Sequence, residues 1–331
     1  MKKQLIKDLR VGEEVETQAL VVEANKQKYS SPHRAGEHFM KMVLGDVSGN
    51  IKGIIWDLNI IKDTINKGDV IFIKGEVTEY YGPQVVINEV RKLDPEKVNR
   101  KMFQPVSNRD PQEMLKEIKQ IITEEISNYY LQKLLKLLFS DKEFVKKFAA
   151  SPAAKTVHHN YVGGLLEHTL EVVYFCRKMM EVYPDGIDGD IVLTGAILHD
   201  MGKIEEYDPF SFNFDITDRG KLLGHISIGK EILDRHIAQI EGFPRDLRLE
   251  LEHVMLTHHG HKEWGSPEIP KTVQAFALFH ADLLSARMSQ FLKLMQGNRS
   301  GESDWSEWDR FLERSVYLKK PDPQPAADNF E

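Results

Sequence analysis

The feature that most constrains this chain is a change in its hydrophobic period near residue 112. Between Glu14 and Val90, short runs rich in valine and isoleucine alternate with polar residues, a period of two that is typical of β-strands. After residue 112, apolar residues recur every three to four positions, as they do along one face of a helix. A chain of 331 residues with this change is expected to hold a β domain followed by a helical domain.

The β part contains five predicted strands separated by turns rich in glycine, asparagine and proline. The predicted strands are Val15–Val22, His38–Leu44, Asn50–Trp56, Asp69–Val77 and Gln84–Asn88. A short apolar segment, Leu58–Ile65, lies between the third and the fourth. This arrangement predicts the small Greek-key barrel called the OB-fold.

Aromatic and basic residues in the predicted barrel favour binding of a single-stranded nucleic acid. Such barrels stack bases on aromatic side chains and follow the phosphate backbone with lysine and arginine. The residues predicted to make these contacts are Tyr29, Trp56, Tyr80, Tyr81, Lys28 and Arg34. For Trp56 the alternative is a place in the core, because side chains along a strand alternate between its two faces.

The whole chain is predicted to be a multidomain α+β protein. We expect residues 1–92 to form the OB-fold, 93–150 a linker and helical connector, 151–300 an all-α domain, and 301–331 a C-terminal helix and tail. The helix is predicted at Asp304–Leu312, packed on the core or on another subunit. The proline-rich end of the tail is expected to be disordered.

Composition excludes several classes of protein. No apolar run approaches the roughly 20 residues of a membrane span, so we expect a soluble protein that has no contact with a membrane. The net charge is −7, which argues against a simple basic coat protein for nucleic acid. The single cysteine, Cys176, excludes an intramolecular disulfide, and no apolar secretory segment follows Met1, so a cytoplasmic location is expected.

The helical part places ionisable residues on or beside the apolar faces of five predicted helices. These residues are His168, His199, Asp200, His225, His258, His259 and Asp282. For the pair His199-Asp200, which ends the apolar run Ile191–Leu198, the ordinary alternative is a core histidine beside a capping aspartate. Five such helices are harder to explain by packing, because buried imidazoles and carboxylates are costly without a shared counter-charge.

A divalent metal would supply that counter-charge. Imidazole and carboxylate ligands suit manganese, iron, cobalt, nickel or zinc, and the absence of sulfur ligands excludes a cysteine-type zinc site. The set is large enough for two ions that share one carboxylate, an arrangement that fits hydrolysis of a phosphate ester. Mn²⁺ is the favoured ion, with Co²⁺, Fe²⁺, Ni²⁺ or Mg²⁺ as alternatives.

The order of these residues resembles the HD-domain phosphohydrolase superfamily over about residues 150–300. Lys203, in the pattern His-Asp-x-Gly-Lys, extends the match. With the preceding OB-fold and the segment His158–Thr169, nearly the whole chain is similar to the YhaM-type 3′-to-5′ exoribonucleases of Gram-positive bacteria.

The resemblance implies a ligand set for each of two ions. The first ion would be held by His168, His199, Asp200 and Asp282. The second would be held by the bridging Asp200, by His225, and by His258 or His259. These last two can share an ion only if Gly260 has already broken the helix there, because adjacent helical residues point about 100° apart.

Three further residues have weaker assignments. Lys203 would act beside Asp200 in catalysis by neutralising a phosphate oxygen or by orienting the nucleophile. His158 and His159 either contact substrate phosphate or have a structural role, and the sequence leaves both readings open.

The resemblance implies hydrolysis of the terminal phosphodiester of single-stranded RNA, with release of nucleoside 5′-monophosphates. Single-stranded DNA stays open as a substrate, because base stacking tolerates both polymers. Two alternatives remain: an HD-type phosphohydrolase of small nucleotides, and a non-enzymatic RNA-binding protein with a structural metal. A homo-oligomer is predicted from the apolar connector helices and the aromatic C-terminal segment.

Overall fold

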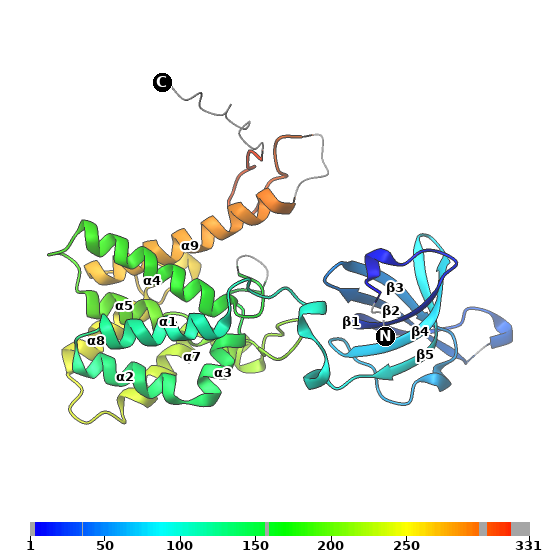
Figure 1. The fold of residues 1–331 in the computed structure, drawn as a ribbon, viewed down its shortest axis with the longest axis horizontal. Coiled ribbons are helices and arrows are strands. Elements are labelled where there is room, and N and C mark those ends of the chain that lie inside the picture. Colours follow the sequence, from blue (N-terminus) through cyan, green and yellow to red (C-terminus); the bar gives the residue numbers. More distant parts are fainter. Residues whose placement is uncertain (1–3, 35, 156–158, 298–302, 319–331) are drawn as a thin grey trace, which may run out of the picture. The chain divides into compact units, whose positions relative to one another are not determined.

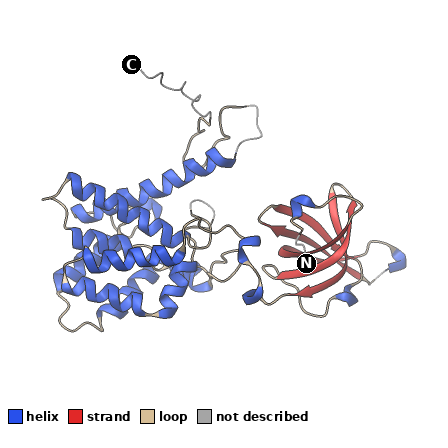
Figure 2. Cartoon of the chain, in the orientation of Figure 1, coloured by secondary structure: helices blue, strands red, loops and turns tan. Residues whose placement is uncertain are grey.

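The computed structural model describes residues 4–34, 36–155, 159–297 and 303–318, and it divides the chain into two compact units. The first unit comprises residues 1–108 and 207–217, and the second comprises residues 109–206 and 218–331. Among the described residues, the β-strands lie in the first unit and the α-helices in the second (Figure 2).

Five strands in the described part of the chain close into a barrel with the order β1-β2-β3-β5-β4 (Figure 1). They are β1 (Glu14–Lys28), β2 (His38–Asp46), β3 (Gly49–Ile55), β4 (Val70–Glu79) and β5 (Pro83–Lys92). Strands β3 and β5 pair in parallel, and the other neighbours pair antiparallel. Alternate apolar residues, among them Val15, Leu44 and Ile71, fill the interior. The predicted five-stranded OB-fold is confirmed.

Residues 93–108 and 207–217 complete the barrel unit. The ring of Phe103 meets the ring of Phe212 edge-on, with centroids 5.8 Å apart. The guanidinium of Arg100 donates to backbone carbonyls in the second segment. Residues 207–217, which connect two helices of the second unit, are therefore held on the barrel unit by aromatic packing and hydrogen bonds.

The helices of the second unit surround one core. They are α1 (Pro111–Glu124), α2 (Tyr129–Ser140), α3 (Lys142–Ala150), α4 (Gly164–Val182), α5 (Gly189–Leu198), α6 (Lys203–Glu206), α7 (Asp218–Ile237), α8 (Arg245–Leu256) and α9 (Val273–Gly297). Short 3-10 turns in the described chain lie at Ile6–Asp8, Pro32–Arg34, Leu58–Ile60, Pro95–Lys97, Arg100–Met102 and Lys262–Trp264. No helix in the described residues has the length and apolar composition of a membrane span.

Side-chain caps explain where the first three helices begin. Asp110, Asn128 and Asp141 directly precede α1, α2 and α3, and the side chain of each accepts backbone N–H bonds from the first turn. The apolar stripes of these helices face the same core as α4, α5, α7, α8 and α9. The predicted connector 93–150 is therefore corrected: its first part packs with the barrel, and its helices belong to the helical unit.

The C-terminal helix predicted at Asp304–Leu312 is wrong. Residues 303–318 are irregular, with isolated bridges that pair Trp305 with Tyr317 and Asp309 with Arg314. Glu313 has a φ of 54°, in the left-handed region, and the backbone N–H groups of Ser306 and Leu318 donate to the carbonyl oxygens of Val316 and Asp304, so the segment folds back on itself instead of forming a helix. The predicted disordered tail lies outside the described residues.

Candidate metal centre and nucleic-acid interface

Helix α5 delivers the His-Asp pair to the interior of the helical unit. The helix is apolar on all sides and buried over Ile191–Leu198, because other helices enclose it. It ends at Leu198, so His199 and Asp200 follow directly, and both are almost completely buried. A buried helix end thus places an imidazole and a carboxylate in the core of the unit.

The first cluster joins α4, the end of α5 and α9. His168 Nε2 lies 3.1 Å from Asp282 Oδ1 and 3.6 Å from Asp200 Oδ2. His199 Nε2 lies 3.4 Å from the same Asp200 oxygen. His168, His199 and Asp282 each offer a ligand atom within 4.8 Å of the others, so they could hold one ion.

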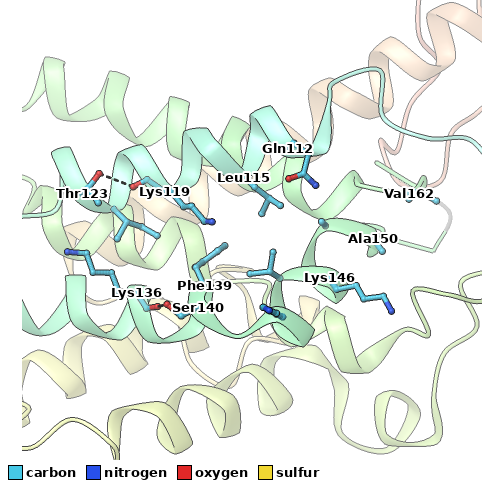
Figure 3. Close-up of a pocket in the computed structure, with 14 residues that line it drawn as sticks. Gln112, Leu115, Lys119, Thr123, Lys136, Phe139, Ser140, Lys146, Ala150 and Val162 are labelled. Atoms are coloured by element: carbon cyan, nitrogen blue, oxygen red, sulfur yellow. Dashed lines mark hydrogen bonds between the residues drawn. The ribbon is translucent and has the colours of Figure 1, made fainter.

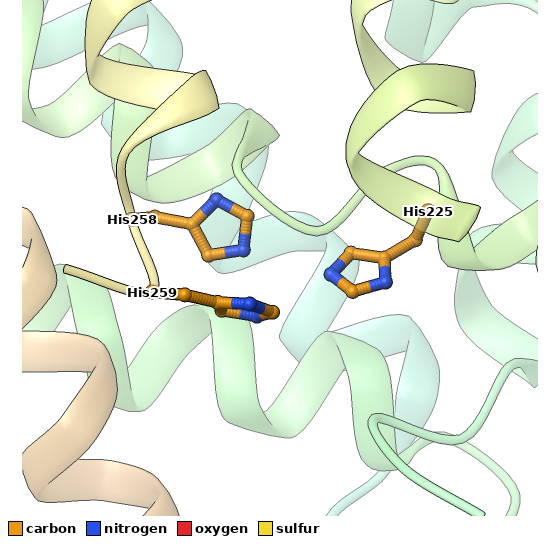
Figure 4. A group of neighbouring side chains, drawn as sticks. All are labelled: His225, His258 and His259. Atoms are coloured by element: carbon orange, nitrogen blue, oxygen red, sulfur yellow. The ribbon is translucent and has the colours of Figure 1, made fainter. Parts of the chain in front are cut away.

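The second cluster joins the kink of α7 to the end of α8 (Figure 4). His225 follows Gly224, whose φ of 69° interrupts α7, and His258 and His259 follow Leu256, the last residue of α8. Because that helix has already ended, the two adjacent imidazoles can turn toward one space. The three histidines have ligand atoms within 4.8 Å of one another.

Asp200 lies between the two clusters. Its Oδ1 atom is 3.5 Å from His225 Nε2 and 3.6 Å from His258 Nε2, whereas its Oδ2 atom faces the first cluster. These separations are too long for good hydrogen bonds, but they suit two ligands of one ion, since metal–ligand bonds are about 2.0–2.2 Å. The carboxylate has the position that a bridging ligand needs.

The Nδ1 atom of each histidine in the two clusters has a partner on the side away from the cavity. The partners are Ser285 Oγ for His168 (2.9 Å), Ala196 O for His199 (2.9 Å), Glu206 Oε1 for His225 (3.3 Å), Met255 O for His258 (2.6 Å) and Trp264 O for His259 (3.0 Å). A carbonyl or carboxylate oxygen requires a proton on Nδ1, and the Ser285 hydroxyl, which already donates to Glu171, accepts from His168 Nδ1. The lone pairs on Nε2 therefore face the cavity, as metal ligation requires.

Buried polar atoms without hydrogen-bond partners test whether a metal fits. Among the described residues, Asp200 Oδ1, His225 Nε2 and His258 Nε2 are buried and make no hydrogen bond. Orphaned buried acceptors are costly, and these three converge on one space. The residues of the centre therefore fit a divalent cation.

The electrostatics of the centre keep its carboxylates ionised. Burial alone would raise the pKa of Asp200, but Lys203 and His199 hold it well below its usual range. Burial likewise opposes ionisation of Asp282, and His168 and His199 lower its pKa. Burial lowers the pKa of His259 to about 3, so its imidazole stays neutral at physiological pH.

Lys203 begins α6 and is buried against Asp200, with Nζ 2.5 Å from Oδ2. The preceding residue must be glycine for a packing reason. A Cβ atom on Gly202 would lie 2.0 Å from the carbonyl oxygen of His225. This close approach brings the start of α6 against the histidine-bearing half of α7, and so brings Lys203 and His225 to the same carboxylate.

Three partners of the ligands were not predicted. Glu171 accepts hydrogen bonds from Ser285 Oγ (2.6 Å) and from His159 Nε2 (3.1 Å), and Ser285 in turn contacts His168. Glu206 contacts His225. Spacing could have found two of them, since Glu171 and Ser285 each lie three residues after a predicted ligand and hence on the same helix face.

Most predicted nucleic-acid contacts meet at one hollow of about 810 Å³ on the barrel. The predicted residues that line it are Lys28, Tyr29, Trp56, Tyr80 and Tyr81. The rings of Tyr29 and Trp56 stack with centroids 5.9 Å apart, and Trp56 is 41% exposed. Arg34 lies outside the lining, with its guanidinium 3.6 Å above the Tyr29 ring.

The two remaining predicted contacts do not join that hollow. His158 lies outside the described residues. His159 is buried behind His168, with ring centroids 5.5 Å apart, and its Nε2 contacts Glu171. This position favours the structural alternative for His159.

A separate hollow of about 850 Å³ lies between α1, α2 and α3 (Figure 3). Its lining mixes apolar residues such as Leu115 and Phe139 with four lysines: Lys119, Lys136, Lys142 and Lys146. The described residues that line it include none of the metal-ligand groups.

The fold and the site together define the class of protein: an OB-fold joined to an HD-type metal-dependent phosphohydrolase. Family models agree, with "HD domain" matching residues 165–287 and "OB-fold nucleic acid binding domain" matching residues 15–93.

Relatives named "3′-5′ exoribonuclease YhaM" align with nearly the whole chain. The protein from Listeria welshimeri is 33% identical over 307 residues, which cover 91% of this chain and 94% of the relative. Those from Shouchella clausii and Bacillus subtilis are 32% and 31% identical, covering 90% and 88% of this chain and 91% of each relative. This chain belongs to the YhaM family.

Proposed function

We propose that this protein is a metal-dependent 3′-5′ exoribonuclease that hydrolyses the terminal phosphodiester of single-stranded RNA and releases nucleoside 5′-monophosphates. The observation that carries the proposal is the Asp200 carboxylate, which faces a histidine cluster on each side, 3.5 Å from His225 and 3.4 Å from His199. A pair of ions sharing one carboxylate is the arrangement used for phosphate ester hydrolysis. The family and the aromatic hollow of the barrel support a strand of RNA as the substrate.

The proposed residue roles follow from position. His168, His199 and Asp282 would hold one ion, and His225, His258 and His259 the other, with Asp200 between them. When bound, such ions supply Lewis acidity that activates water and neutralises phosphate charge. Lys203, tied to Asp200, would place its ammonium beside a phosphate oxygen and stabilise charge that develops in the transition state.

The identity of the ion is a separate proposal. Five imidazoles and two carboxylates form a mixed nitrogen and oxygen set, which suits Mn²⁺ and also Co²⁺, Fe²⁺ or Ni²⁺. A pure oxygen set would favour Mg²⁺, so Mg²⁺ is expected to support activity less well than Mn²⁺.

A labelled 20-nucleotide single-stranded RNA tests the proposed function. With a 5′ label and Mn²⁺, a ladder that shortens from the 3′ end is expected, and chelator should abolish it. Asp200→Ala should fold and bind the RNA but leave it uncut. Cleavage that survives chelator or this substitution would exclude the metal mechanism.

The same assay separates the two alternatives. A phosphohydrolase of small nucleotides would hydrolyse mononucleotides and leave the oligonucleotide intact. A non-enzymatic binder would retain the RNA unchanged with every metal. A single-stranded DNA of the same sequence measures the preference for ribose.

We also propose a homo-oligomer, on the basis of the outer face of α9. Large apolar side chains recur along it at helical spacing and remain exposed; they are Val273, Phe276, Leu284, Met288 and Leu292. Such a stripe is typical of a helix that packs on a partner. Light scattering of the wild type against Leu284→Glu tests this, and a monomeric wild type would overturn it.

A reducing cytoplasm stays the expected compartment, since the single cysteine cannot form an intramolecular disulfide.

A further inference from the structure

A hollow of about 550 Å³ opens directly above the metal centre. Its floor includes the predicted ligands His258, His259 and Asp282, together with Lys203. Its walls carry three aromatic rings and two guanidinium groups; these belong to Trp264, Phe279, Phe311, Arg287 and Arg310. The C-terminal segment 303–318 thus contributes to the same cavity as the metal ligands.

That segment is anchored on α9 by specific contacts. Gln290 Nε2 donates to Asp309 Oδ1 at 2.6 Å, and the Arg287 guanidinium donates to the carbonyl oxygen of Phe311. Leu312 and Val316 bury their side chains, so the segment has an apolar anchor as well. The wall formed by Arg310 and Phe311 is held in place by polar and apolar contacts, although it is not a helix.

The chemistry of the walls matches a nucleotide. Phe311 and Trp264 are 51% and 48% exposed, so each leaves a ring surface on which a base can stack. Arg310 offers a guanidinium for a phosphate. Glu313 lies on the same lining and offers a carboxylate, the acceptor that ribose hydroxyls bind.

We propose that residues 303–318 complete a subsite for the 3′-terminal nucleotide, in which Phe311 stacks on the base, Arg310 binds phosphate and Glu313 accepts the ribose hydroxyls. The proposal rests on the proposed function, because it names the part of the substrate that this wall recognises. Arg287 acts as a positioning residue through the Phe311 carbonyl. The subsite binds any base, since stacking on an aromatic ring does not read base edges.

Equilibrium binding of adenosine 5′-monophosphate and of inorganic phosphate to the full-length, Mn²⁺-loaded protein tests the subsite. Loss of one stacking ring costs about 1–3 kcal/mol per base, or roughly 5- to 150-fold in affinity. Phe311→Ala should lower the affinity for adenosine 5′-monophosphate by that factor and leave the affinity for inorganic phosphate unchanged. Arg310→Gln should weaken the binding of both ligands. Glu313→Gln should weaken the binding of adenosine 5′-monophosphate until its affinity approaches that of the 2′-deoxy analogue.

A matched control lies in the same segment. Trp308 is 65% exposed and does not line the hollow, so Trp308→Ala should leave both affinities unchanged. Phe311→Tyr keeps the ring and should bind like the wild type, which separates stacking from a general effect on folding. Unchanged nucleotide affinity in Phe311→Ala, or an equal loss of phosphate affinity, would overturn the subsite.

The outcomes also distinguish the two proposals. A wild type that binds adenosine 5′-monophosphate through Phe311 but does not shorten RNA would sustain the subsite and defeat the exoribonuclease. A wild type that shortens RNA, with a Phe311→Ala variant of normal nucleotide affinity, would defeat the subsite alone.

Discussion

Asp200 Oδ1 lies 3.5 Å from His225 Nε2, across the carboxylate from the first histidine cluster. If this carboxylate bridges two ions, single substitutions should remove them separately. His225→Ala is expected to lower bound manganese from two ions per chain to one, and Asp200→Ala to remove both. Elemental analysis after gel filtration measures the number of manganese ions bound per chain. His236→Ala, on the same helix but with its ring nitrogen on the Ile232 carbonyl, is the control. Two ions retained in His225→Ala would show that His225 is not a ligand, and two ions retained in Asp200→Ala would exclude the bridge.

The contacts from His168 through Ser285 to Glu171 should tune metal affinity. Ser285 Oγ accepts from His168 Nδ1 and donates to Glu171, which fixes the tautomer and raises the basicity of the ligand nitrogen. Glu171→Gln is therefore expected to weaken Mn²⁺ binding about 10- to 100-fold while the protein stays folded. Competition with a fluorescent chelator measures the affinity. Glu181→Gln, on the exposed end of α4, should not change the Mn²⁺ affinity. Equal Mn²⁺ affinities in the two variants would show that the contacts from His168 through Ser285 to Glu171 do not tune metal binding.

A methyl group at Gly202 should separate α6 from α7. Because its Cβ would lie 2.0 Å from the His225 carbonyl oxygen, Gly202→Ala forces the backbones apart. We expect a loss of stability of roughly 1–3 kcal/mol together with loss of the second ion. Thermal unfolding and metal content check both effects. Gly186→Ala is the control, since a Cβ there meets ordinary contacts at 3.8 Å; a Gly202→Ala protein of normal stability and metal content would refute the packing argument.

Removing an aromatic ring from the barrel hollow should weaken the binding of single-stranded RNA without changing the catalytic step. Trp56→Ala is expected to weaken the binding of single-stranded RNA by about 1–3 kcal/mol, because the substitution deletes one stacking surface. Fluorescence anisotropy in the presence of chelator measures affinity while cleavage is suppressed. Tyr129→Ala removes an exposed ring from the helical unit and serves as the control. Equal affinities for Trp56→Ala and the wild type would show that the hollow does not bind RNA.

The metal-free protein should lose stability as the pH falls from 7.5 to 5.5. Burial lowers the pKa of His168 and His258, and that of His259 to about 3. The unfolded chain takes up protons at these histidines near pH 6.5 more readily than the folded chain, so acid favours unfolding. His199, whose pKa is raised because its two aspartate neighbours outweigh its burial, acts in the opposite direction: its stabilising effect is complete below pH 6.5 and is lost as the pH rises.

Three histidines are expected to outweigh one, so the Tm in chelator should fall across that pH range. Asp200 and Asp282 contribute only at lower pH, because their pKa values are lowered and the unfolded carboxyl groups titrate near pH 4. Differential scanning fluorimetry measures the slope, and His259→Gln should reduce it. A Tm that is constant or that rises on acidification would contradict the prediction.

The amino-acid sequence determined the architecture, because hydrophobic period and turn chemistry are local properties. The alternation from Glu14 to Val90 predicted five strands, and the helical stripes after residue 112 predicted the second unit. The metal-ligand candidates were also visible, since buried histidines and aspartates on apolar helix faces are costly without a counter-charge.

Tertiary structure alone decided which atoms meet. The sequence could not assign the two Asp200 oxygens to different clusters, because that depends on how α4, α7, α8 and α9 pack around the end of α5. Nor could it place residues 207–217 with the barrel or Phe311 above the metal centre, since both depend on contacts between segments distant in sequence. Local patterns fix the elements, and long-range packing fixes the site.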